Sequence, residues 1–168
     1  DPGSAGYAAA ATLAAVGSAV GVSLCVGIAS AWLFVAGSRV NAVVLATTAV
    51  VGVACSELLK LLIARPRPFD ALLEPSGFSY PSGHSMGAAA LATGLALVAL
   101  AHVGARRSRA WVIIAAVSWV TLMMWSRTAL HVHWLSDTIA GALLGWSVAV
   151  LVRAVLMRAA VTRAAAGP

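Results

Sequence analysis

The chain has 168 residues, enough for one domain; 61% of them are hydrophobic and only 10% are charged. A soluble domain carries about 25% charged residues, so this chain has too few charges to cover a water-facing surface, and a lipid bilayer is its expected solvent. The net charge of +6 comes from basic residues between long apolar runs, not from one basic face with interleaved aromatic side chains, which argues against nucleic-acid binding.

Five apolar stretches are long enough to cross a bilayer, whose hydrocarbon core of about 30 Å needs roughly 20 residues of helix. In chain order, the predicted spans lie within residues 2–38, 40–64, 84–103, 110–126 and 133–153. The alternation of apolar and polar residues that is typical of strands is absent from these stretches. The sequence therefore predicts an all-α fold, a polytopic transmembrane helix bundle formed by one domain over residues 1–168.

Two glycine pairs, Gly17-x-x-x-Gly21 and Gly141-x-x-x-Gly145, predict places where helices approach one another closely. Five spans would leave the N-terminus outside the cell. Because the chain begins with Asp1 and not with a methionine, the sequence leaves room for a sixth span before it.

Basic residues are unequally divided between the two sides of the predicted bundle. Seven of the eleven fall on one side, in the connection between the first and second spans, in the connection between the third and fourth spans, and in the C-terminal tail. They are Arg39, Arg106, Arg107, Arg109, Arg153, Arg158 and Arg163. The five acidic residues lie on or near the other side. An excess of Lys and Arg marks cytoplasmic connections, so the other side is predicted to be extracytoplasmic.

Three polar clusters interrupt the apolar pattern, and all three fall on the predicted outer side. They are Lys60-x6-Arg67-Pro68, Pro81-Ser82-Gly83-His84 and Ser126-Arg127-x5-His133-x3-Asp137. Each alone has a plainer interpretation, as interfacial anchors, a helix cap or a structural ion pair. Ionisable groups within membrane spans are costly and mark functional sites, so three clusters on one side together predict a single site.

The cations of this site suit a phosphate group. Lys60 and Arg67 are about two helical turns apart and would share one helix face. Pro66 and Pro68 are expected to end that helix and to let Arg67 turn toward the site. Arg127 adds a planar fork of donors that fits phosphate oxygens. Three fixed cations near one point predict a polyanionic ligand.

The second cluster stands just before the third predicted span. The free backbone N–H groups and the dipole of a helix start form an anion site. Ser82 is expected to cap this helix or to donate to a phosphate oxygen, and Gly83 lets the backbone approach the ligand. His84 is then placed as a general acid for the departing oxygen.

The third cluster contains a candidate nucleophile. His133 and Asp137 are four residues apart and would lie on one helix face. The carboxylate can keep one imidazole nitrogen protonated, which leaves the other free to attack phosphorus. His131 is a competitor, but it lies six residues from Asp137 and so on another face, and we therefore choose His133. Glu57 and Arg65 are expected to support the site or to pair with each other.

In these residues the chain resembles the type 2 phosphatidic acid phosphatase (PAP2) superfamily, whose pattern is Lys-x6-Arg-Pro, Pro-Ser-Gly-His and Ser-Arg-x5-His-x3-Asp. All three elements match in order over residues 60–137, the motif core. The resemblance implies a helix bundle, no metal or other cofactor, and a covalent phosphohistidine intermediate. It implies that His133 is the nucleophile, Asp137 its orienting partner and His84 the acid. The residues that it assigns to the phosphate are Lys60, Arg67, Ser82, Gly83 and Arg127.

Soluble relatives in this superfamily include acid phosphatases and vanadate haloperoxidases, so the fold alone does not fix the reaction, but the membrane spans favour a lipid phosphate substrate. Only twelve residues, 69–80, separate the first two motifs, so we expect a site that opens sideways to the membrane lipids, with the lipid tail between spans. Small bacterial members such as this chain resemble polyprenyl-phosphate phosphatases. The resemblance therefore implies hydrolysis of a lipid such as undecaprenyl diphosphate or decaprenylphosphoryl-5-phosphoribose at the extracytoplasmic face of the bacterial plasma (inner) membrane.

Other functions remain open on the sequence. The substrate could instead be phosphatidate or phosphatidylglycerol phosphate. A lipid phosphotransferase would share the same first half-reaction and differ only in the acceptor. A non-enzymatic lipid-binding or transport subunit is disfavoured, because such a protein would be expected to have lost catalytic residues and every motif residue is present.

Overall fold

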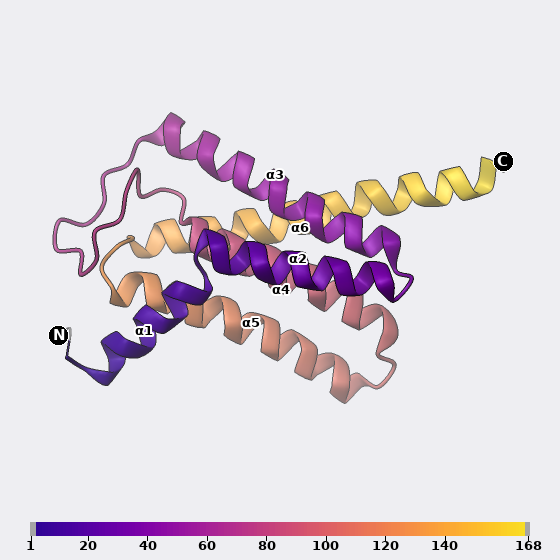
Figure 1. Ribbon diagram of the computed structural model, residues 1–168, viewed down its shortest axis with the longest axis horizontal. Coiled ribbons are helices and arrows are strands. Elements are labelled where there is room, and N and C mark those ends of the chain that lie inside the picture. The colour runs from indigo at the N-terminus through magenta and orange to yellow at the C-terminus, as the bar shows by residue number, and fades with distance from the viewer. Residues whose placement is uncertain (1–2, 167–168) are drawn as a thin grey trace.

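The computed structural model describes residues 3–166, and every regular element within that range is a helix. In chain order these are α1 (Ala5–Val16), α2 (Ala19–Val35), α3 (Arg39–Ile63), α4 (Gly83–His102), α5 (Arg106–Ala129) and α6 (Leu135–Ala166). Together they form one elongated bundle, from which the C-terminal part of α6 projects (Figure 1). The predicted all-α class is confirmed.

The first predicted span is a broken helix. Among the described residues, α3 to α6 are each long and apolar enough to cross a membrane, while α1 and α2 make one further candidate that is bent by 53°. The helix breaks because Gly17 ends α1 and the side chain of Ser18 begins α2, accepting the Gly21 N–H at 3.1 Å. Five spans result if the bent pair is one span, which is the number that the sequence predicts.

The first glycine pair, Gly17 and Gly21, lies at the break between α1 and α2. A Cβ atom at Gly21 would lie 2.1 Å from the carbonyl oxygen of Val16, and one at Gly17 would lie 2.3 Å from Cε of Met123 in α5. Hydrogen at these two positions therefore lets the chain bend sharply and lets α1 rest against α5. The expected close approach is present at Gly17, whereas Gly21 faces the preceding turn of its own chain.

The connections between helices gather at two opposite ends of the bundle (Figure 1). One end holds the α2–α3 and α4–α5 connections, where Arg39 and residues 106–109 lie. The other holds the long α3–α4 segment, residues 64–82, and the short α5–α6 turn, residues 130–134. The three polar clusters therefore lie at one end, opposite most of the basic residues.

The start of α4 is held against the start of α6 by backbone contact. A Cβ atom at Gly141 would lie 2.3 Å from the carbonyl oxygen of Ser82, and one at Gly145 would lie 2.2 Å from that of Met86. Only glycine fits at such distances. The close helix approach predicted at Gly141-x-x-x-Gly145 is confirmed, and it fixes the second polar cluster relative to the third.

Gly141→Ala is expected to destabilise the protein, because its methyl group would push the Ser82 carbonyl and the N-terminus of α4 away from α6. Overpacking of this kind costs about 1–3 kcal/mol. The matched control is Gly27→Ala in α2, where a Cβ atom meets nothing within 4 Å. Thermal unfolding in detergent measures both variants, and equal unfolding temperatures would contradict the assigned contact.

Candidate active site

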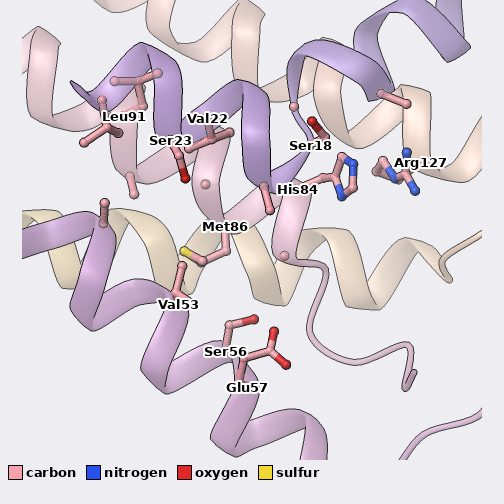
Figure 2. Close-up of a pocket in the computed structure, with 18 of the residues that line it drawn as sticks. Ser18, Val22, Ser23, Val53, Ser56, Glu57, His84, Met86, Leu91 and Arg127 are labelled. Carbon is pink, nitrogen blue, oxygen red and sulfur yellow. The ribbon is translucent and has the colours of Figure 1, made fainter. Parts of the chain in front are cut away.

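A cavity of about 1010 Å³ extends from the polar end of the bundle into the space between α2, α3 and α4. Its polar end is lined by cationic and imidazole side chains from all three clusters: Lys60, Arg67, His84, Arg127 and His133. The rest is lined mainly by small and apolar side chains, among them Val22, Val53 and Leu91 (Figure 2). The structure therefore brings the three sequence clusters together at the head of one apolar groove.

Arg127, in the last turn of α5, is a buried cation that lacks partners. Its side chain lies beside that of His84 (Figure 2). The residue is only 4% exposed, and its Nε and Nη1 have no hydrogen-bond partner among the described residues. Arg67 is near enough to repel it. A buried guanidinium without hydrogen bonds is costly, so an anion is the partner that this position requires.

Arg67 holds the α3–α4 segment in place. The helix ends at Ile63, before the two prolines, as predicted. Nε of Arg67 donates to the carbonyl of Gly77 at 2.9 Å, and Nη2 donates to that of Ser76 at 2.9 Å. Its Nη1 donates to the carbonyl of Val132 at 2.8 Å. The guanidinium thus ties this segment to the α5–α6 turn, and the residue also lines the cavity.

Lys60 and Gly83 face each other across the head of the cavity. Lys60 lies in the last turn of α3, and its Nζ is 2.6 Å from Oε1 of Glu57. The same Nζ would be 3.6 Å from a Cβ atom at Gly83. The space above Gly83 is therefore open and next to a positive charge, as the sequence predicts for a phosphate position.

Ser82 caps α4, which is one of its two expected roles. Its Oγ accepts the N–H of Ser85 at 3.5 Å, and its own N–H donates to the carbonyl of Asp137 at 2.9 Å. Ser82 is fully buried behind the cavity wall, whereas Gly83 and His84 line the cavity. Ser82 thus positions the other two residues.

His133 lies in the turn before α6 and is only 5% exposed. Its Nδ1 is 2.8 Å from the backbone carbonyl oxygen of Ser79. A carbonyl can only accept, so Nδ1 carries the proton and Nε2 carries the lone pair. Nη1 of Arg67 lies 3.3 Å from Nε2 and can donate to it, and both residues line the cavity. Nε2 is therefore unprotonated, and its lone pair faces a donor of Arg67.

Asp137 lies at ion-pair distance from His133 but makes no direct hydrogen bond with its ring. Its Oδ2 is 3.8 Å from Nδ1 of His133, too far for a hydrogen bond. Oδ2 instead accepts from Oγ of Ser79 at 2.5 Å and from the N–H of Trp134 at 3.0 Å. Because α6 begins at Leu135, His133 precedes the helix; the two side chains still approach to ion-pair distance, but not closely enough for a direct hydrogen bond. Asp137 reaches the imidazole through Ser79.

Two residues outside the three motifs support the site: Ser79, which the sequence did not indicate, and Arg65, for which a supporting role was one of two expectations. Ser79 is fully buried and connects His133 to Asp137, but it lies outside every motif and gave no signal. Arg65 donates from Nη1 to Oδ1 of Asp137 at 2.7 Å and so does not pair with Glu57, whose partner is Lys60. The sequence indicated Arg65 because it is an ionisable residue close to the first motif.

His131, the competing histidine, lies away from the cavity. Its Nδ1 is 2.6 Å from Oδ2 of Asp70, and both side chains are about half exposed. Its backbone has a φ of 53°, a left-handed conformation that lets the turn point this side chain outward. The pairing lowers the pKa of the Asp70 carboxyl below its ordinary value. This contact joins the α3–α4 segment to the α5–α6 turn.

Burial lowers the pKa of His133 from its ordinary value to about 3, and the positive charges of Arg67 and Arg127 act in the same direction. An imidazole in this position is neutral at pH 7. Because the pKa is lower in the folded protein than the value of about 6.5 for an unfolded histidine, the unfolded chain takes up the proton first. The stability that His133 contributes is therefore complete above about pH 6.5 and is lost as the pH falls toward 3.

Histidine NMR of the phosphate-free protein is expected to show His133 neutral at pH 5, with its proton on Nδ1. His131, half exposed on the surface, serves as the internal comparison. The His133 signal is assigned by its loss in His133→Gln. A protonated His133 at pH 5 would contradict the geometry described above.

The family model of the PAP2 superfamily matches residues 40–160. Undecaprenyl-diphosphatase of Sulfolobus acidocaldarius is 33% identical over 115 residues, which are 64% of this chain and 52% of the relative. Phosphatidylglycerophosphatase B of Bacillus subtilis is 38% identical over 93 residues, 54% of this chain and 45% of the relative. The chain thus spans about half the length of these curated relatives.

A solved structure has the same fold. The crystal structure of a transmembrane PAP2-type phosphatidylglycerolphosphate phosphatase from Bacillus subtilis superposes with a TM-score of 0.81 at 26% sequence identity. The match covers 90% of this chain and 77% of that protein. It therefore includes nearly the whole bundle described above.

Proposed function

This chain belongs to the PAP2 superfamily, and from that premise we propose that it hydrolyses a phosphate ester or diphosphate of a membrane lipid through a phosphohistidine intermediate. The observation that supports this most is the buried Arg127, whose Nε and Nη1 lack partners in the cavity that His84 and His133 also line. A phosphoryl group supplies the acceptors that this guanidinium lacks.

In the first step, the phosphoryl group is held by the cations at the head of the cavity, with Nε2 of His133 aligned on phosphorus. Its lone pair forms the P–N bond as the P–O bond to the lipid breaks. His84 gives its proton to the departing oxygen. The carbonyl of Ser79 keeps the proton on Nδ1 and stabilises the positive charge that develops on the ring.

In the second step, His84 is neutral and accepts a proton from a water molecule. The water oxygen attacks phosphorus, and the P–N bond breaks. The electron pair returns to Nε2 of His133, and inorganic phosphate leaves. The cations stabilise charge on the phosphoryl oxygens in both steps, and fixed donors of this kind account for a large part of enzymatic rate enhancement.

The lipid tail is proposed to occupy the apolar part of the cavity. This groove begins at the phosphate position and continues along α2, α3 and α4, where its lining includes Val26, Val50 and Leu91. Its volume of about 1010 Å³ is at the upper limit of typical ligand pockets, about 300–1,000 Å³. A polyprenyl substrate, such as undecaprenyl diphosphate or decaprenylphosphoryl-5-phosphoribose, suits such a groove.

We further propose that the active site faces the extracytoplasmic side of the plasma membrane. Seven of the eleven basic residues lie toward the end of the bundle opposite the site (Figure 1). Such an excess of Lys and Arg marks the cytoplasmic side. A second candidate substrate is phosphatidylglycerol phosphate, which the names of the Bacillus subtilis relative and of the solved structure favour.

The direct test is a substrate panel for the purified protein in detergent: polyprenyl monophosphate, polyprenyl diphosphate, phosphatidate and phosphatidylglycerol phosphate. Release of inorganic phosphate from at least one lipid is expected, and the relative kcat/KM values identify the substrate. A water-soluble phosphomonoester without a lipid chain serves as the matched control and should react more slowly. Failure to release phosphate from every lipid would contradict the proposed function.

A further inference from the structure

Ser56 and Glu57 line the cavity but have no part in the steps above. They stand one turn before Lys60 in α3, and their side chains leave the helix on the same side (Figure 2). Ser56 is only 1% exposed, and its Oγ has no hydrogen-bond partner among the described residues. These two residues therefore add a buried hydroxyl and a more than half exposed carboxylate to a cavity wall that is mainly apolar.

The unpaired hydroxyl of Ser56 is unusual for a helix. A buried serine or threonine within a helix commonly bonds a carbonyl of the preceding turn, as Thr48 of the same helix does with Val44 at 2.8 Å. Ser56 makes no such bond, and burial of an unpaired hydroxyl costs free energy. A ligand group in the cavity would supply the missing partner.

Position along α3 indicates which part of a ligand meets Ser56 and Glu57. With a helical rise of 1.5 Å per residue, Ser56 lies about 6 Å deeper than Lys60, and Val53 lies about 10 Å deeper. A phosphorylated lipid that enters with its phosphate at Lys60 would reach Ser56 with the group that links phosphate and lipid. Its apolar chain would begin near Val53.

Glu57 complements Ser56 chemically. Its Oε1 holds Nζ of Lys60 at 2.6 Å, and Oε2 accepts no hydrogen bond from the described residues, so it can accept one from a ligand. A carboxylate oxygen and a serine hydroxyl on neighbouring residues of the cavity lining suit a group that carries free hydroxyls. The same carboxylate would repel a second phosphate placed directly after the first.

We propose that Ser56 and Glu57 form a subsite for free hydroxyl groups on the segment that links phosphate to lipid, an inference that rests on the proposed function. The subsite selects phosphomonoesters carried on a glycerol or sugar linker. Among the candidate substrates it therefore favours decaprenylphosphoryl-5-phosphoribose and phosphatidylglycerol phosphate over undecaprenyl diphosphate, whose second phosphate would lie beside the Glu57 carboxylate. The two residues are thus determinants of specificity among lipid phosphates.

The test compares kcat/KM for phosphatidylglycerol phosphate with that for an analogue whose linker is propane-1,3-diol, which lacks only the free hydroxyl. The wild-type protein is expected to prefer the hydroxyl-bearing lipid by about tenfold. Ser56→Ala and Glu57→Gln should each bring this ratio close to one. Both lipids present the same phosphate to Lys60, so any effect of Glu57→Gln on Lys60 cancels in the ratio.

The matched control is Ser30→Ala in α2, which also removes a buried unpaired hydroxyl but lies outside the cavity lining. Its ratio should equal that of the wild type. A parallel arm with a ribose 5-phosphate linked to a polyprenyl phosphate, measured against polyprenyl diphosphate, distinguishes a sugar linker from a glycerol linker. Preference for the hydroxyl-bearing member of either pair, lost in the two variants, supports the subsite.

Equal kcat/KM values for both members of each pair in the wild type would overturn the subsite while leaving the phosphatase proposal intact. A wild-type preference that persists in both variants would overturn it as well. Release of phosphate from no lipid at all would overturn the proposed function, and this inference with it.

Discussion

Replacement of His133 by alanine is expected to reduce phosphate release from the lipid substrate to background. The variant lacks Nε2, the ring atom that the Ser79 carbonyl leaves unprotonated in a residue that lines the cavity. Without it the first P–N bond cannot form. The measurement is inorganic phosphate released in detergent, together with a quench experiment that detects an acid-labile phosphoenzyme formed from radiolabelled substrate.

The matched control for this result is His131→Asn, because asparagine tolerates the left-handed backbone at that position. His131 lies on the surface with Asp70 and should be dispensable for phosphate release and for the phosphoenzyme. Undiminished turnover in His133→Ala would contradict the assignment, as would a phosphoenzyme that survives in that variant. His84→Ala should retain the nucleophile but react about 10²–10⁴ times more slowly, the usual contribution of a general acid and base.

Arg127→Met is expected to lower kcat/KM by at least about 10²-fold and yet to raise the unfolding temperature of the phosphate-free protein. The loss of activity follows because removal of one preorganised donor to a transition state costs about 10²–10³ in rate. The gain in stability follows because a buried cation without partners is replaced by an apolar side chain of similar length. Replacement of buried charges by packed apolar groups often stabilises by about 1–4 kcal/mol.

Thermal unfolding with and without orthovanadate separates these two effects. The wild-type protein should gain about 2.7 kcal/mol of stability at a ligand concentration 100 times its dissociation constant, whereas Arg127→Met should gain much less. Arg106→Met, at the opposite end of the same helix, is the matched control and should respond as the wild type does. A full vanadate response in Arg127→Met, or a lowered unfolding temperature without ligand, would contradict the role assigned to this side chain.

The composition of the site could be predicted from the sequence because polar residues within apolar spans must find partners or a ligand. Lys60, His84, Arg127 and His133 all line one cavity, as three clusters on one side of the bundle imply. The helical class followed from uninterrupted apolar stretches, and the close approach of α4 and α6 followed from the Gly141 motif.

Other features of the fold and of the site could not be predicted from the sequence. The break between α1 and α2 lies in a stretch of small uncharged residues, where hydropathy alone indicates one straight span. The partner of His133 is a backbone carbonyl, which every residue has, so nothing marked Ser79 in advance. The four-residue spacing indicated that Asp137 lies near His133, as it does at 3.8 Å, but the connection through Ser79 could not be predicted, because His133 precedes the helix.

The central claim is that three distant stretches of the chain build one phosphoryl site around Nε2 of His133. A structure of the protein determined with orthovanadate tests this most directly. We predict vanadium bonded to Nε2 of His133, with vanadate oxygens accepting hydrogen bonds from Arg127 and Lys60. Vanadate bound away from His133, or these three side chains found on separate surfaces, would contradict the claim.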